Sequence, residues 1–348
     1  MSNYKSLALA LTLMVTSAFA NQGSLKDGHP DHYVVKKGDT LWDISALFLN
    51  SPWLWPEIWY VNPQVSNPHL IYPGDELTLV YVDGKPQLRI NRRGKRGGLK
   101  LSPRARPESL DNAIPTIPLD AIQQFLSKPL VVGKDELAKA AYVVSSAGEH
   151  LITGAGDRVY LRGVSDDATI GQNLFRPGDA YIDPDSGEIL GYEAKYLGEG
   201  KISRSGDPST LQLTRTTREI NIGDRALPIE NESIHPYFSP HPTSEDMDGS
   251  IISVLDGVSQ IGQYQIVIIN RGTREGVDVG TVMSIEQKGA LIRDQVSRKR
   301  NDLVQLPDEK AGLLMVFRTF EKVSYALILK ATEALHVGDK VRHPDNLS

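Results

Sequence analysis

Residues 35–44 specify the local structure of the N-terminal part and read Val35-Lys36-Lys37-Gly38-Asp39-Thr40-Leu41-Trp42-Asp43-Ile44. Asp39 or Thr40 can cap a helix here, and Thr40 followed by Asp43 is a capping-box pattern. Leu41, Ile44 and Phe48 recur at helical spacing and should face a core. The sequence therefore predicts a turn followed by an amphipathic helix.

Working outward, Tyr33-Val34-Val35 reads as a short strand before this helix. Pro56 suits the first turn of a second helix, and Pro63 ends it. Residues 76–80 then supply a closing strand. A second signature stands between this helix and this strand, namely Asn62-Pro63 followed by Leu70-Ile71-Tyr72-Pro73-Gly74-Asp75. The predicted order is βααβ.

These motifs, in this order, resemble the LysM domain, a βααβ module that binds polymers of N-acetylglucosamine and, in bacteria, peptidoglycan. The resemblance implies a domain over residues 30–82 and a shallow glycan groove between two loops. It assigns eleven residues to that groove: Gly38, Asp39, Thr40, Leu41, Asn62, Pro63, Leu70, Ile71, Tyr72, Pro73 and Gly74. Structural roles compete, because both glycines suit tight turns, Leu41 suits a core and Asn62 suits a helix cap.

All four tryptophans, Trp42, Trp53, Trp55 and Trp59, lie in this module. A tryptophan buries up to about 250 Å², so a core this small is expected to leave at least one exposed. Trp53 and Trp55 are the candidates for an aromatic contact, either with a glycan or with a protein. The protein contact is preferred, because the groove is formed by other loops.

The first twenty residues predict an export signal. Lys5 precedes an apolar run from Leu7 to Val15, and Ala18-Phe19-Ala20 supplies a cleavage signature. A retained membrane anchor is the alternative, although the run is too short to cross a bilayer comfortably. No transmembrane segment is expected after cleavage, and the mature chain is expected outside the cytoplasm.

Composition argues against several function classes. The chain has no cysteine, which excludes disulfides, thiolate metal sites and cysteine nucleophiles. The net charge of −5 becomes −6 when Lys5 is removed, which disfavours a nucleic-acid partner. The eight histidines are scattered, and no Gly-x-Ser-x-Gly pattern occurs. We therefore expect no metal, no cofactor and no catalytic site.

Residues 83–128 read as a basic and proline-rich linker. Eight basic residues and no acidic ones lie between Arg89 and Arg106. Two interpretations stay open, a solvated loop or weak attraction to anionic wall polymer or lipid headgroups. A short helical pattern at Ile122, Phe125 and Leu126 follows.

The remaining chain is rich in alternating strands and glycine–aspartate turns, and it repeats itself. Val159-Tyr-Leu-Arg-Gly163 echoes Ile268-Ile-Asn-Arg-Gly272, and Ile222-Gly223-Asp224 echoes Val337-Gly338-Asp339. Two small barrel- or sandwich-like modules, over residues 129–232 and 247–348, account for this repetition. The fold class is therefore multidomain α+β and mainly β.

The second copy contains two further motifs, residues 249–264 and Ala311-Gly-Leu-Leu-Met-Val-Phe-Arg-Thr-Phe320. They are similar to a C-terminal domain of the FlgT kind. Together with one LysM domain and a signal peptide, they resemble the TsaP family, peptidoglycan-binding partners of the type IV pilus secretin. This resemblance implies a non-enzymatic anchor between peptidoglycan and an outer-membrane secretin ring. It also implies a location in the periplasm, at the cell wall and outer membrane. A LysM-targeted wall hydrolase or hydrolase activator, and a general envelope-integrity protein, are the alternatives.

Overall fold

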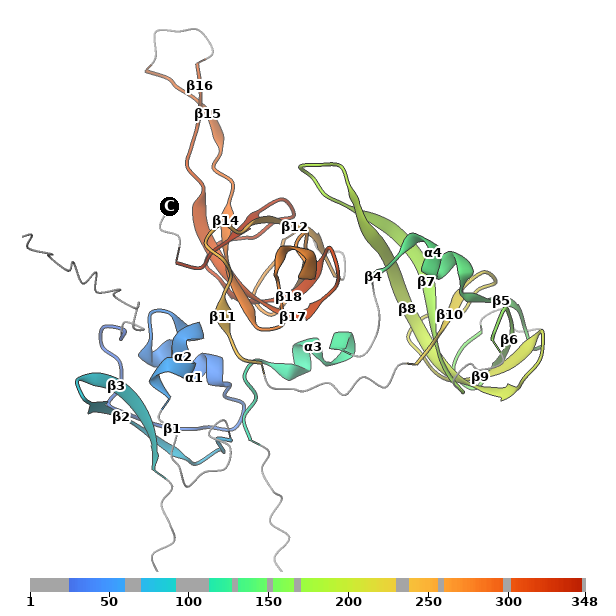
Figure 1. Ribbon diagram of the computed structural model, residues 1–348, viewed down its shortest axis with the longest axis horizontal. Helices are drawn as coiled ribbons and strands as arrows, with labels where there is room; N and C mark the ends of the chain where they lie inside the picture. Colours follow the sequence, from blue (N-terminus) through green and yellow to red (C-terminus); the bar gives the residue numbers. More distant parts are fainter. Residues whose placement is uncertain are drawn as a thin grey trace, which may run out of the picture.

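The computed structural model describes residues 25–59, 70–91, 113–126, 131–148, 153–165, 170–229, 238–255, 260–296 and 302–345. The expected signal peptide, residues 1–20, lies outside these ranges, and so do Asn62 and Pro63. Figure 1 shows an N-terminal module (residues 25–91), a middle module (131–229) and a C-terminal module (238–345). The predicted fold class is confirmed, since strands dominate both modules that follow the first.

The N-terminal module folds two short helices against a small antiparallel sheet of order β1-β2-β3. Its elements are β1 (His32–Val34), α1 (Leu41–Phe48), the 3-10 helix η1 (Pro52–Leu54), α2 (Trp55–Ile58), β2 (Glu76–Val82) and β3 (Lys85–Asn91). The prediction that residues 83–91 belong to the linker is wrong, because β3 occupies Lys85–Asn91. Asp83 and Gly84 both have positive φ, 51° and 78°. An Asp-Gly pair of this kind makes a two-residue hairpin turn, and β3 therefore returns along β2.

Residues 113–126 connect the N-terminal module to the C-terminal one, and we call them the strap. The strap begins with an extended stretch and ends in α3 (Leu119–Leu126), where the helical pattern had been noticed. Arg318 Nη1 donates to the Phe125 carbonyl at 3.0 Å, which joins α3 to the C-terminal module. Of the eight basic residues expected in the linker, Arg89 lies in β3 and the other seven lie outside the described residues.

The middle module is a small barrel. Its elements are β4 (Val131–Val132), α4 (Lys134–Lys139), β5 (Ala141–Ser146), β6 (Arg158–Arg162), β7 (Gly171–Ile182), β8 (Ile189–Arg204), β9 (Ser209–Thr216) and β10 (Arg225–Pro228). The strand order is β4-β8-β7-β10-β5-β6-β9, and an additional β8–β9 pairing closes the barrel. Leu161, Leu174, Leu197 and Leu211 fill its interior.

The C-terminal module repeats this arrangement. Its elements are β11 (His241–Pro242), β12 (Asp248–Val254), β13 (Ile266–Ile269), η2 (Thr273–Glu275), β14 (Thr281–Gln287), β15 (Leu291–Arg293), β16 (Leu303–Gln305), β17 (Glu309–Thr319), β18 (Ser324–Ala331) and β19 (Lys340–Arg342). The order is β11-β14-β17-β18-β13-β12-β19, closed by β14–β19. When β5 to β10 are matched in chain order to β12, β13, β14, β17, β18 and β19, the two barrels have the same connectivity. The module also starts earlier than residue 247, because β11 pairs with β14.

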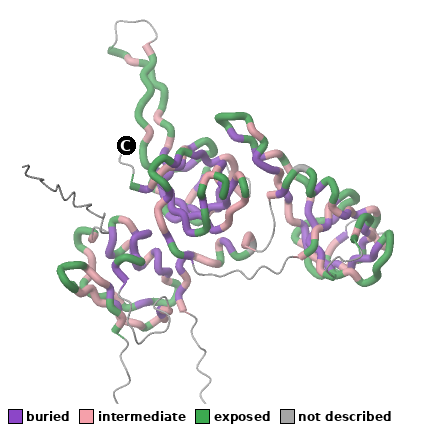
Figure 2. The backbone as a smooth tube through the Cα atoms, viewed as in Figure 1, coloured by how far each residue is buried: buried purple, intermediate pink, exposed green. Residues whose placement is uncertain are grey.

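Strands β13, β17 and β18 are apolar on both faces, which explains their unbroken hydrophobic runs. In β17, Leu314 and Val316 point into the barrel core, while Leu313, Met315 and Phe317 belong to a second cluster outside it. That second cluster extends through the strap into the N-terminal module. The alternating pattern of a half-exposed strand is therefore absent here, because another layer covers the outer face (Figure 2).

The β7–β8 hairpin joins the two barrels (Figure 1). At its tip, Asp183 accepts a hydrogen bond from Asn270 Nδ2 at 3.2 Å and lies 3.5 Å from Arg271 Nη1. Glu188 pairs with Arg274 at 3.0 Å and with Lys322 at 2.7 Å. The middle module is thus held to the C-terminal module by a polar contact built around two carboxylates.

Candidate functional site

Two loops of the N-terminal module lie side by side, residues 36–41 and residues 70–75. The Gly74 amide donates to the Val35 carbonyl at 2.8 Å, and the Val35 amide donates to the Asp75 carbonyl at 2.9 Å. Gly38 and Gly74 have φ of 96° and 93°, a backbone region that favours glycine. These are the loops to which the resemblance assigned glycan binding, and both predicted glycines stand at their turns.

Asp39 organises the first loop. Its Oδ2 accepts from the Tyr33 hydroxyl at 2.9 Å and from the Lys36 amide at 2.8 Å. Burial, reinforced by the Asp39 carboxylate, raises the pKa of Tyr33 to about 12. Tyr33 therefore stays a neutral donor at physiological pH, and Asp39 shapes the loop that precedes α1.

Thr40 is the N-cap of α1. Its hydroxyl accepts from the Asp43 amide at 3.1 Å and donates to Asp43 Oδ2 at 2.7 Å. Thr40 and Leu41 are both buried. Their side chains therefore support the helix, while the backbone of Leu41 remains a candidate for the groove.

We predict that Thr40→Ala lowers the free energy of unfolding of this module by about 1 kcal/mol, the usual cost of losing a cap. Thr40→Ser is the matched control, because it keeps the hydroxyl that accepts from Asp43. All four tryptophans lie in this module, so tryptophan fluorescence during thermal unfolding follows the module together with the segments that cover the rings. Equal midpoints for the two variants would contradict the capping role.

The second loop is held by Asp75, whose Oδ2 accepts from the Tyr72 amide at 3.0 Å. Ile71 is fully buried, whereas Leu70, Tyr72 and Pro73 are half-buried and Gly74 is exposed. The structure thus brings the described part of the predicted site together at one edge of the module. The role of these residues in glycan binding stays a prediction.

The strap also lies between these two loops, which the sequence analysis did not predict. The Leu41 amide donates to the Pro115 carbonyl at 2.9 Å, and the Trp42 amide donates to the Thr116 carbonyl at 3.1 Å. On the other side, the Ile114 amide donates to the Ile71 carbonyl at 2.8 Å. The sequence feature that could have indicated this docked segment is the largely apolar, proline-containing run from Ile114 to Pro118, which stands within a polar segment.

The expectation of an exposed tryptophan is wrong. Trp42, Trp53, Trp55 and Trp59 are all less than 8% exposed: 4%, 3%, 2% and 7%. Trp55 and Trp59 pack edge to face with ring centroids 5.9 Å apart. Helix η1, which carries Trp53, also contacts β11 of the C-terminal module. The rings exceed what the isolated module could bury, but neighbouring parts of the same chain cover them.

Comparison with known proteins agrees with this geometry. The family model of the LysM domain matches residues 33–80, which span β1, both helices and most of β2. Residues 33–80 form a LysM domain. LysM domains generally bind peptidoglycan and are typically extracellular or associated with the cell wall, so the match supports a cell-wall-binding role.

A curated relative carries the same signal. The chain is 38% identical over 60 residues to a protein of Bacillus subtilis (strain 168) described as "Uncharacterized protein YqbP". The match covers 14% of this chain and 27% of the relative. The match therefore covers a small part of either chain and says nothing about the remainder of this one.

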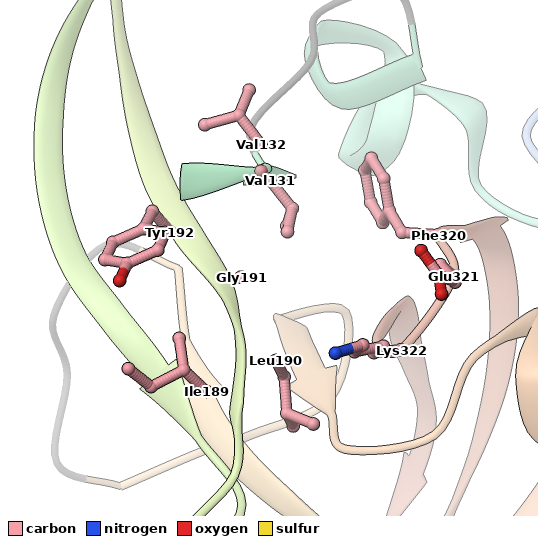
Figure 3. Close-up of a pocket in the computed structure, with 10 residues that line it drawn as sticks. Val131, Val132, Ile189, Leu190, Gly191, Tyr192, Phe320, Glu321 and Lys322 are labelled. Atoms are coloured by element: carbon pink, nitrogen blue, oxygen red, sulfur yellow. The ribbon is translucent and has the colours of Figure 1, made fainter. Parts of the chain in front are cut away.

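Outside the LysM domain, a cavity of about 480 Å³ lies between β8 and the β17–β18 turn (Figure 3). Val131, Leu190, Tyr192 and Phe320 supply much of its wall, and Glu321 and Lys322 are its charged residues. Lys322 already pairs with Glu188. This lining holds neither a pair of carboxylates nor a nucleophile next to a base, two arrangements that catalyse hydrolysis in other proteins.

A second cluster has the composition of a catalytic triad but not its geometry. His241 Nε2 lies 2.7 Å from Asp278 Oδ1 and 3.3 Å from Thr281 Oγ1. In a triad, the acid and the nucleophile contact opposite nitrogens of the imidazole, whereas both groups here contact the same one. Nδ1 lies 3.0 Å from the Ser239 carbonyl. The cluster fastens β11 to the turn before β14.

Among the residues that the structure describes, no group of three or more histidine, aspartate or glutamate side chains is placed to hold a metal ion. Within the same ranges, none of the helices has the length and apolar character needed to span a membrane.

Proposed function

We propose that this protein is a non-catalytic, exported peptidoglycan-binding protein that anchors an outer-membrane secretin ring of a type IV pilus to the cell wall. The observation that carries the proposal is the LysM domain, folded with its two candidate loops side by side. Two resemblances support a secretin as the partner and the periplasm as the location. The C-terminal module is similar to FlgT-like domains, and the arrangement of the whole chain is similar to the TsaP family.

The partner contact is proposed for the ribbon formed by β15 and β16, which projects from the C-terminal barrel (Figure 1). Ile292 lies opposite Val304 on one face, and Leu303 lies opposite Arg293 on the other. Both faces therefore carry exposed apolar side chains: Leu291, Ile292, Val296, Leu303, Val304 and Leu306. A cluster of exposed apolar groups on a two-stranded ribbon favours a protein contact.

The internal repeat supports this assignment. The ribbon extends the β14–β17 hairpin, which occupies the position of the β7–β8 hairpin in the middle barrel. The β7–β8 hairpin holds a neighbouring barrel through Asp183 and Glu188. The equivalent hairpin of the second barrel is therefore suited to hold a domain of another protein.

Attachment to a secretin ring would also compensate for a weak affinity of each single LysM domain for glycan. A shallow, polar glycan groove recovers little of the free energy that association costs, so a single LysM domain should bind modestly. Copies of the protein carried by one ring would raise the effective concentration at the wall and bind it by avidity. Anchoring against force therefore requires the two contacts together.

The test is recovery of the secretin from solubilised envelopes on the immobilised chain. The expected result is secretin recovery that is lost in Ile292→Lys/Val304→Lys. A matched control, Gln287→Lys, adds a charge on the same hairpin outside the apolar ribbon. Recovery that is unchanged in the ribbon variant would reject this surface, and failure to recover any secretin with the wild-type chain would favour the envelope-integrity alternative.

A wall hydrolase is the other alternative, and it predicts a different result. We expect no release of soluble fragments when the chain is incubated with labelled sacculi between pH 5 and pH 9, because neither the cavity nor the His241 cluster has catalytic geometry. Release that rises with protein concentration and survives repurification would contradict the non-enzymatic proposal. Release only in the presence of a purified amidase would favour the activator alternative.

A further inference from the structure

The strap lies between the two loops proposed to bind glycan. Three backbone groups are involved: the Leu41 and Trp42 amides, which donate to Pro115 and Thr116, and the Ile71 carbonyl, which accepts from Ile114. The first N–H groups of a helix have no partner within the helix and need one outside it. Here the strap supplies that partner for α1 and also satisfies the opposite loop.

The strap offers the same chemistry as the proposed ligand. The N-acetyl group of an aminosugar is an amide with one N–H donor and one carbonyl acceptor. The strap presents one amide donor to the second loop and two carbonyl acceptors to α1. The hydrogen-bonding groups that an N-acetyl group would use are therefore already occupied by peptide groups of the chain itself.

Side-chain burial holds the strap in place. Ile114, Thr116 and Ile117 are each no more than 3% exposed. Pro115 and Pro118 restrict the backbone around them to extended conformations. A segment that is already extended loses little conformational freedom when it docks, which favours a stable closed arrangement.

We infer that residues 113–117 are an internal ligand of the LysM groove, and that peptidoglycan binds by replacing them at the Leu41 and Trp42 amides and the Ile71 carbonyl. This inference rests on the proposed glycan-binding function. Residues 113–117 lead directly to α3 at the end of the strap, whose Phe125 carbonyl accepts a hydrogen bond from Arg318 of the C-terminal module. Glycan binding therefore competes with the attachment of the LysM domain to the C-terminal barrel.

The most direct test follows the amide hydrogens of the intact chain by exchange and NMR, with and without the tetramer of N-acetylglucosamine. We expect the Ile114 amide to lose protection when the tetramer binds, while the Leu41 and Trp42 amides stay protected by their new partner. If the tetramer binds and the Ile114 amide remains protected, the strap does not occupy the binding site and the inference is overturned.

A substitution in the strap provides a second test of the inference. Ile114→Asp places a charge in the buried contact and should release the strap, which raises the apparent affinity for the tetramer and for sacculi by about tenfold, because a closed fraction no longer has to open. Gln123→Asp is the control, since it adds the same charge at an exposed position of α3. The dispersion of the amide signals in the NMR spectrum shows whether each variant is folded.

The possible results distinguish failure of the inference from failure of the proposed glycan-binding function. Tighter binding by folded Ile114→Asp supports the strap as an internal ligand, even if the wild-type chain binds weakly. Equal affinity of the folded variant and the wild type overturns the inference but leaves glycan binding standing. If neither folded protein binds the tetramer or sacculi, the proposed glycan-binding function fails, and the inference fails with it.

Discussion

Ile44→Ala is expected to lower the free energy of unfolding of the LysM domain by about 2–5 kcal/mol, the range for truncating a buried isoleucine. Ile44 lies on the inner face of α1 and is 1% exposed. Small domains are stabilised by only about 5–15 kcal/mol in total, so this change removes a large share of their stability. Urea unfolding followed by tryptophan fluorescence measures it.

Leu47→Ala is the matched control for this prediction. Leu47 belongs to the same helix but is 40% exposed, and its truncation should cost under about 1 kcal/mol. The comparison holds the helix and the type of change constant and varies only burial. Equal costs for the two variants would show that α1 does not pack as the structure describes.

Asp183→Ala should weaken the contact between the two barrels by about 2–3 kcal/mol, because it removes charge-assisted hydrogen bonds and leaves Arg271 with an unpaired, partly buried charge. Asp185→Ala is the control. Its carboxylate pairs with Lys340 at 3.1 Å but is 60% exposed, so the loss should stay below about 1 kcal/mol. Limited proteolysis and thermal unfolding of the two variants measure the difference. If the two variants have equal proteolysis rates and equal unfolding midpoints, Asp183 does not hold the two barrels together as described.

The same contact sets a pH dependence. Burial alone would raise the pKa of Asp183, but hydrogen bonds from the Asp185 and Ser186 amides and from Asn270, together with Arg271, outweigh it and hold this pKa below its ordinary value. A lowered pKa stabilises the folded state above the unfolded value of about 3.9, and that stabilisation is lost as the pH falls through the folded value. The contact should therefore be intact at neutral pH and weaken only below about pH 4.

Local signals predicted much of the LysM domain. The cap at Thr40, the helical spacing of Leu41, Ile44 and Phe48, and the turn glycines each follow from short-range chemistry, and the structure places them accordingly. Asp83-Gly84 is also a local signal, yet the high basic content that follows it led to the prediction of a linker. At this position the Asp-Gly turn signal predicts the structure better than the basic composition does.

What the sequence did not predict depends on contacts between distant segments. The four tryptophans look too numerous for one small core, and only the strap and the C-terminal module explain their burial. Residues 114–116 show no periodicity that would place them against α1, because their partners are backbone groups whose positions arise from the fold. The repeat motifs predicted two modules, but barrel closure depends on non-local pairings.

Sedimentation of the intact chain with purified sacculi, with and without soluble tetramer of N-acetylglucosamine, tests the central claim that the LysM domain binds peptidoglycan. We expect the chain to pellet with sacculi and the tetramer to return it to the supernatant. A glucose tetramer at the same concentration should leave the chain in the pellet. A chain that stays in the supernatant, or that pellets regardless of the competing aminosugar, would contradict it.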